Sequence, residues 1–363
     1  MKNISGKSEE EFFEKSMLTG GDIFSLTVSR DLTNIDEFLV FCYKRYKENT
    51  YLDKFSWIDN IKYIKDKDLI EELNNCLLNE IKNKNFNQVW MAVPEIIEWE
   101  DVKGFKISGD SNCYSDIYIE KVIDSLKNDL TKIEQLETKR IRAISNRDDS
   151  ETAYEWSSYN CIIAEISHKN NEYCLSNGKW YKINKDFSEN INSTYEAIDL
   201  CNDNLINYNH KDEDKYNEEL QKHLSQSILL HKYKITIGGG QGNNIEPCDI
   251  LWKNKMFFIK KNGGSGLLSH LFNQALVSSQ MWLEPNCIKQ LKTKMKDNNE
   301  SINIPDPFNS SNYEIVFGII NKFKDERPKI PFFSKVAIYF TVKSIKRYGY
   351  KISLKNINNE LII

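Results

Sequence analysis

The stretch from residue 246 to residue 282 constrains the fold of this chain most strongly. Two short apolar runs, residues 250–252 and 256–259, are separated by Lys253-Asn254-Lys255, a spacing typical of a β-hairpin. A glycine-rich segment follows at residues 262–266, and apolar side chains then recur at helical spacing from Leu267 onward. The pattern predicts a strand, a turn, a strand and an amphipathic helix in direct succession.

Two ionisable residues stand at matching ends of the predicted hairpin. Asp249 begins the first strand and Lys260 ends the second, so antiparallel pairing brings them to the same end. Carboxylates are the ligands that Mg²⁺ prefers, and a nearby lysine can orient water and offset phosphate charge. Glu246 lies just ahead of Asp249, and Glu213 lies on the preceding predicted helix.

These residues are the candidates for a metal-dependent hydrolytic site. We expect Glu213, Asp249 and Lys260 to be catalytic, with Glu213, Glu246 and Asp249 as ligands of Mg²⁺, for which Mn²⁺ can substitute. A structural interpretation stays open for each of them. Asp249 can be a turn residue, and Lys260 can extend its ammonium to solvent from a strand end.

The segment after the hairpin has the residues needed to bind phosphate. The candidates for nucleic-acid contact are Lys261, Gly263, Gly264, Ser265, Ser269, His270 and Gln274. Backbone N–H groups at a helix N-terminus can receive a phosphate, and His270 and Gln274 share a helix face at i, i+4 spacing. A simple strand-to-helix turn and a buried histidine are the alternatives. The glycines at 238–242 match no phosphate-binding motif and indicate a hairpin tip or a lid.

The formal charge is unevenly distributed. Residues 1–229 carry 29 Lys and Arg against 43 Asp and Glu, whereas residues 230–363 carry 20 against 10. A basic C-terminal part favours an anionic partner, DNA or RNA, although a solvated surface or docking on the acidic half stays open.

Several classes of protein and site are not expected. No run of 18 apolar residues predicts a membrane span, and residues 1–11 lack a signal-peptide core, so we expect a cytoplasmic protein. The eight cysteines form no C-x-x-C pair, which disfavours a zinc site and indicates reduced thiols. No G-x-S-x-G elbow is present, and the five histidines suggest no Ser–His–Asp or Cys–His arrangement.

The order of predicted elements indicates a mixed α/β (α+β) fold in two domains. Residues 1–205 form a mixed α/β accessory domain with helices at 34–46 and 66–82 and a β-meander at 159–183 that turns at Asn177-Gly178. The polar segment 201–212 is the predicted boundary. Residues 206–363 then give the order α-β-β-β-α-β, with helices predicted at 212–229, 267–282 and 335–348.

Four segments resemble a bacterial family of unknown function, described as sporadically distributed and common near mobile and defence genes. They are residues 91–105, 173–183, 245–274 and 330–336, and residues 213–217 are similar to the E-x-x-Y-N of that family. The C-terminal order also resembles the restriction-endonuclease-like PD-(D/E)XK core. That resemblance places Glu213, Asp249 and Lys260 at the E, D and K positions.

The resemblance implies a metal-dependent nuclease in antiphage or mobile-element defence. One departure weakens metal binding, because Phe258 stands two residues before Lys260, where the nuclease motif has a carboxylate. The alternative is therefore a catalytically inactive sensor or adaptor in a defence system. Such a protein would bind nucleic acid, or it would bind a protein of the phage or of the defence system. A homo-oligomer also stays open.

Overall fold

A computed structural model of the chain describes residues 4–8, 13, 17–20, 24–27, 31–95, 97, 101–127, 129–148, 151–210, 212–236, 244–262, 265–298 and 300–361. The chain divides into two compact units, Met1–Asn60 and Ile61–Ile363. The first unit contains an antiparallel sheet of β1 (Ile4–Lys7), β2 (Met17–Gly20) and β3 (Phe24–Ser25), followed by η2 (Leu32–Asn34), α1 (Ile35–Lys47), α2 (Leu52–Phe55) and η3 (Ser56–Asn60).

The second unit begins with two antiparallel sheets and their helices. One sheet has the order β4 (Ile61–Tyr63), β12 (Lys179–Ile183), β11 (Asn171–Ser176), β10 (Ile162–His168) and β5 (Val89–Met91). The other has the order β7 (Cys113–Tyr114), β6 (Val102–Ile107), β8 (Arg140–Ser145) and β9 (Thr152–Ser157). The helices of this part are α3 (Lys67–Lys82), α4 (Ile119–Ser125), α5 (Glu134–Thr138), α6 (Ser158–Cys161) and α7 (Lys185–Glu196).

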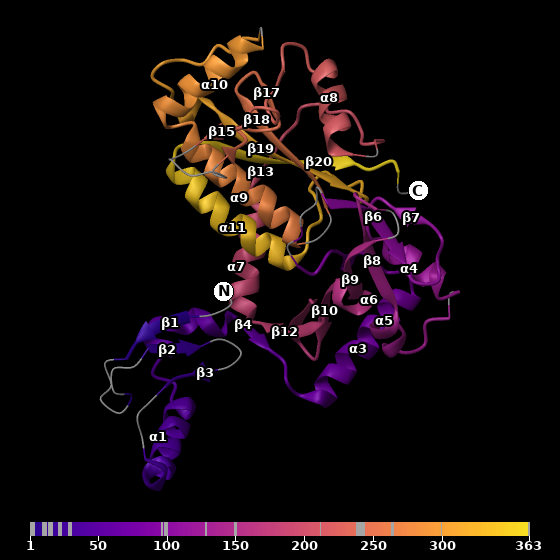
Figure 1. Ribbon diagram of the computed structural model, residues 1–363, viewed down its shortest axis with the longest axis vertical. Coiled ribbons are helices and arrows are strands. Elements are labelled where there is room, and N and C mark those ends of the chain that lie inside the picture. The colour runs from indigo at the N-terminus through magenta and orange to yellow at the C-terminus, as the bar shows by residue number, and fades with distance from the viewer. Residues whose placement is uncertain are drawn as a thin grey trace. The chain divides into compact units, whose positions relative to one another are not determined.

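A six-stranded mixed sheet organises the C-terminal part of the second unit (Figure 1). Its order is β13 (Asp199–Leu200), β20 (Lys351–Asn358), β19 (Glu314–Asn321), β18 (Lys255–Lys261), β17 (Ile250–Trp252) and β14 (Ile228–Leu229). β17 runs antiparallel to β14 and β18, whereas β18, β19, β20 and β13 pair in parallel. The remaining elements are α8 (Glu213–His223), β15 (Ile235–Thr236), β16 (Asn244–Ile245), α9 (Ser265–Met281), α10 (Pro285–Asp297), η5 (Ser310–Asn312) and α11 (Phe332–Arg347).

Helices cover both faces of this sheet. Along β18, Phe257 and Ile259 pack in one apolar core with residues of α8, whereas Met256 and Phe258 pack in another with residues of α9 and α11. This alternation follows from the two-residue period of a strand. α9 and α11 lie side by side on their face (Figure 1). Phe258 is fully buried, so an apolar side chain at this position belongs to the core.

Two predicted hairpins are present. The β17–β18 turn contains only Lys253 and Asn254, and Lys253 adopts a φ of 54°. The β11–β12 turn is formed by Asn177 and Gly178, with φ values of 50° and 67°. These left-handed conformations are those that Asn-Gly hairpin turns require. A Cβ atom at position 178 would also collide with Oδ1 of Asn160.

One element prediction is wrong in the segment that precedes the hairpin. The helix predicted over 212–229 ends at His223, because Leu224 is extended, and Gln226 then has a φ of 62° in the turn before β14. The helix α10 buries Ile288, Leu291 and Met295 on its inner face.

The predicted mixed α/β fold is confirmed. The boundary predicted near residue 205 stays a prediction and falls inside the second unit, where Tyr208 is fully buried. No helix in the described part of the chain is long and apolar enough to cross a membrane.

Candidate active site

The candidate site lies where the β17–β18 hairpin opens. β17 pairs with β18 through Ile250, Leu251 and Trp252, and the N–H group of Asp249 then donates to the carbonyl oxygen of Phe257 at 2.9 Å. Beyond this point the side chain of Asp249 replaces the missing strand, because its Oδ2 accepts the N–H of Ile259 at 2.6 Å. The end of β18 therefore projects past β17.

Glu213 reaches this strand end from the first turn of α8. The helix begins there because the Asp212 side chain accepts the N–H of Lys215 at 2.8 Å, which is an N-cap. Glu213 Oε2 accepts the Lys260 ammonium at 2.7 Å, and Oε1 accepts the N–H of Lys261 at 2.9 Å. The structure thus brings Glu213, Asp249 and Lys260 together.

Burial controls the electrostatics of the cluster. Asp249 is only 8% exposed, and desolvation raises the pKa of its carboxyl to about 7, although the bond from Ile259 opposes the shift. Burial lowers the pKa of the Lys260 ammonium, but the charge and hydrogen bond of Glu213 outweigh it and raise that pKa above its usual value. The site therefore holds an ammonium beside a carboxyl that changes protonation near neutral pH.

The cluster opens into a cavity of about 750 Å³. Besides the three residues above, its walls include Glu246, His270 and Gln274, which were also predicted for the site. Gln274 lies on α9 and donates from Nε2 to Glu246 Oε2 at 3.0 Å.

The predicted phosphate-binding residues are not all placed at this cavity. Ser269 and Lys261 do not line it, and the Lys261 ammonium lies 4.8 Å from the centre of the Tyr208 ring. Gly263, Gly264 and the side chain of Ser265 lie outside the described residues, as do the glycines at 238–240 and 242.

The sequence did not reveal two further polar groups in the cavity wall. Asn217 Oδ1 and His231 Nδ1 are buried and make no hydrogen bond within the described structure. Asn217 is one helical turn beyond Glu213, so the i, i+4 spacing on α8 was the available signal. A buried acceptor without a partner is costly, and its position indicates that a donor or a cation can bind there.

The cavity offers oxygen donor atoms, which suit a hard divalent cation, but these atoms are not grouped around a single point. Glu213, Glu246, Asp249 and Asn217 offer the oxygen ligands that Mg²⁺ prefers. Within the described residues, however, no three His, Cys, Asp or Glu side chains are grouped closely enough to hold a metal. Both oxygens of Glu213 bind Lys260 and Lys261, and Phe258 offers no ligand.

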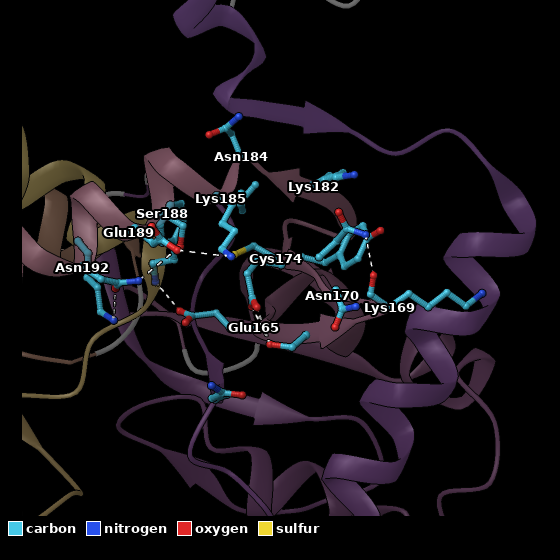
Figure 2. A pocket seen from close by; sticks show the side chains of 18 of the residues that line it. Glu165, Lys169, Asn170, Cys174, Lys182, Asn184, Lys185, Ser188, Glu189 and Asn192 are labelled. Atoms are coloured by element: carbon cyan, nitrogen blue, oxygen red, sulfur yellow. Dashed lines mark hydrogen bonds and ion pairs between the residues drawn. The ribbon is translucent and has the colours of Figure 1, made fainter.

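A larger cavity of about 1330 Å³ lies elsewhere in the second unit, against β10, β11, α7 and the start of α11 (Figure 2). Burial raises the pKa of the Glu165 carboxyl in its wall. Glu165 accepts the N–H of Phe332, and Lys335 donates to Asn192 Oδ1 at 2.9 Å. None of the residues predicted for catalysis lines this cavity.

Comparison with known proteins gives one match. No curated protein and no solved structure matches the chain. A model of a family of unknown function, DUF6119, matches residues 1–358, which is nearly the whole sequence. The chain therefore belongs to the DUF6119 family.

Proposed function

We propose that the cavity at the open end of the β17–β18 hairpin is the active site of a Mg²⁺-dependent nuclease, in which Mn²⁺ can replace Mg²⁺. The observation that carries the proposal is the convergence of Glu213, Asp249 and Lys260 from three separate elements into one cavity. A lysine and a buried carboxyl with a pKa near 7 are suited to proton transfer and charge stabilisation at neutral pH.

The order of elements supports the same proposed function. α8, β14, β17, β18, α9 and β19 follow one another in the α-β-β-β-α-β order that resembles the PD-(D/E)XK core, with β15–β16 and α10 inserted. Glu213 begins the helix, Asp249 precedes the middle strand and Lys260 is near the end of the third strand.

Each residue has a proposed role. Glu213 and Asp249 would hold the metal, with Glu246 or Asn217 as further oxygen donors. The bound metal would supply Lewis-acid activation of water and of the phosphate. Lys260 positions the attacking water and offsets the charge of the phosphate, and His270 and Gln274 lie where they can contact the nucleic-acid backbone.

We infer the substrate from the charge of residues 230–363 and the biological role from the resemblance to a bacterial family. Residues 230–363 carry an excess of ten positive charges, which would attract DNA or RNA. The resemblance to defence-associated bacterial proteins suggests antiphage or mobile-element defence in the cytoplasm, with a phage or defence protein as a further partner.

A second function is favoured by Phe258. Because this ring is buried where the nuclease motif has a carboxylate, the chain can be a sensor or adaptor that binds nucleic acid without cutting it. Binding that weakens with salt and is not followed by cleavage identifies this function.

The test uses labelled single-stranded and duplex DNA and RNA oligonucleotides with Mg²⁺ or Mn²⁺. We expect cleavage by the unmodified chain and a loss of at least about 100-fold in Asp249→Asn and Lys260→Ala. Lys253→Ala is the matched control, because this exposed lysine lies in the turn at the far end of the hairpin. Equal cleavage by all four proteins refutes the site, and binding without cleavage supports the sensor.

A further inference from the structure

A second cluster of reactive side chains lies on α3 and at the end of β10, among residues that do not line the cavity of the candidate active site. Glu72 and Cys76 are four residues apart on α3, so they share one face of the helix. His168 ends β10 and lies between them. Its Nε2 is 2.8 Å from Glu72 Oε2, and its Nδ1 is 3.7 Å from the Cys76 sulfur.

The carboxylate determines which nitrogen of His168 can take a proton. An ionised carboxylate only accepts hydrogen bonds, so Nε2 of His168 carries the hydrogen that bonds to Glu72. In the neutral imidazole the lone pair is then on Nδ1, which faces the thiol of Cys76. A thiol, an imidazole base and a carboxylate that orients the base are the parts of a nucleophilic triad.

The surroundings keep the carboxylate ionised and the helix in place. Lys169 donates to Glu72 Oε2 at 2.6 Å, and this bond, with that from His168, lowers the pKa of the Glu72 carboxyl below its usual value. Asn74 on the same helix accepts hydrogen bonds from Tyr159 and Trp180 at 2.8 and 2.9 Å, which fixes α3 against the sheet. Such support is what a preorganised site requires.

Two other uses of the cluster fit less well. The sulfur and the carboxylate contact opposite nitrogens of the His168 ring, so the three groups cannot point at one metal ion. Cys161 is fully buried in the core, whereas Cys76 packs against the same core and is only half-buried, as reactive cysteines commonly are.

We propose that Cys76, His168 and Glu72 form a nucleophilic thiol site for α,β-unsaturated carbonyl compounds. The sulfur attacks the β-carbon as the thiol proton moves to Nδ1 of His168, and a C–S bond forms while the C=C π bond breaks. The electron pair of that π bond passes to the enolate, which then takes the proton at its α-carbon. No group leaves and no oxidant is needed.

Reaction of the full chain with N-ethylmaleimide tests this site, with the rate at each cysteine followed by peptide mass spectrometry. Cys42 is the internal reference, because it is also half-buried and also lies on a helix. At pH 7 we expect Cys76 to react at least about tenfold faster than Cys42. His168→Gln removes this advantage, Glu72→Gln reduces it, and the rate at Cys42 stays the same in both.

Buried Cys161 and Cys248 show whether each variant is folded, because they stay unmodified in the intact protein. Equal rates at Cys76 and Cys42 in the unmodified chain overturn the proposal. An unchanged Cys76 rate in a folded His168→Gln protein also overturns it.

Discussion

At the scale of single residues, Asp249 is the most informative position in the protein. It is an acid held almost without solvent, and its carboxyl has a pKa raised to about 7. A buried carboxylate destabilises the folded state when it ionises. A position with only a structural role is therefore not expected to hold an acid. Such destabilising buried groups are common in active sites, because their shifted pKa lets them titrate near neutral pH.

Asp249→Asn is therefore expected to stabilise the protein at high pH. Between about pH 4 and pH 7 the unfolded chain has lost the Asp249 proton while the folded chain keeps it, so the stability of the unmodified protein falls as pH rises through this window. Asparagine keeps an acceptor for the N–H of Ile259 and never ionises. At pH 8 the variant should gain about 2–4 kcal/mol in the free energy of unfolding.

Urea unfolding of both proteins at pH 4.5 and pH 8 checks this prediction. The difference should be largest at pH 8 and fall to about 1 kcal/mol or less at pH 4.5, with nuclease activity lost in the variant. A variant that is less stable at pH 8 would show that the Asp249 carboxylate is a net stabilising group.

The sequence indicated some of these residues and not others. Asp249 and Lys260 could be paired because a hairpin has a regular register, and the position of Glu213 at a helix start placed it near them. His231 could not be recognised, because its relevance depends on burial without a hydrogen-bond partner, whereas Asn217 ends the E-x-x-Y-N segment and is four residues after Glu213. The contact between His168 and Cys76 joins residues 92 positions apart, which no local pattern predicts.

At the scale of elements, helix caps illustrate what local sequence can specify. Asp66 precedes α3 and accepts the N–H groups of Asp68 and Leu69 at 3.0 and 3.3 Å. Glu284 has the same position before α10 but makes no capping hydrogen bond. The two residues form a matched pair within one unit of the chain.

Asp66→Ala should lower the free energy of unfolding by about 1 kcal/mol, because it leaves N–H groups of the first turn without their acceptor. Glu284→Ala should change it by less than about 0.5 kcal/mol. Urea unfolding monitored by circular dichroism measures both. A loss in the Glu284 variant as large as that in the Asp66 variant would contradict the role of the cap.

Helices and strands were predicted correctly where an apolar pattern extended over several turns of helix or where the turn residues were specific. The helix at 66–82 and the 159–183 meander were predicted well, because the first has a clear apolar face and the second turns at Asn177-Gly178. The sheet of β6, β8 and β9 was missed, since its strands mix charged with apolar residues. The strand β14 was missed because it follows α8 after only a short reversal.

At the scale of the whole molecule, residues before and after position 205 contribute to the same sheet and to the same helix packing. β13 pairs with β20 in the C-terminal sheet, and α7 packs against α11. Glu165 also accepts the N–H of Phe332 at the start of α11. These contacts join residues on both sides of position 205, and we predict that residues 61–363 fold together.

Truncation distinguishes this view from a boundary near residue 205. A chain of residues 61–363 should unfold in one cooperative transition, whereas residues 206–363 alone should fail to fold, since the sheet loses β13 and α11 loses α7. Circular dichroism and urea unfolding of both fragments measure the outcome. A stable, cooperative 206–363 fragment would support the boundary predicted from composition.

Lys260 donates to Glu213 at 2.7 Å beside Asp249, so we propose that the two residues depend on each other in cleavage. The most direct test is the Mg²⁺-dependent cleavage rate of Glu213→Gln, Lys260→Ala and the protein with both changes. We expect each single change to lower the rate at least about 100-fold and the double variant to be little slower than the slower single variant. Losses that multiply in the double variant, or a single variant that cleaves at the unmodified rate, would contradict it.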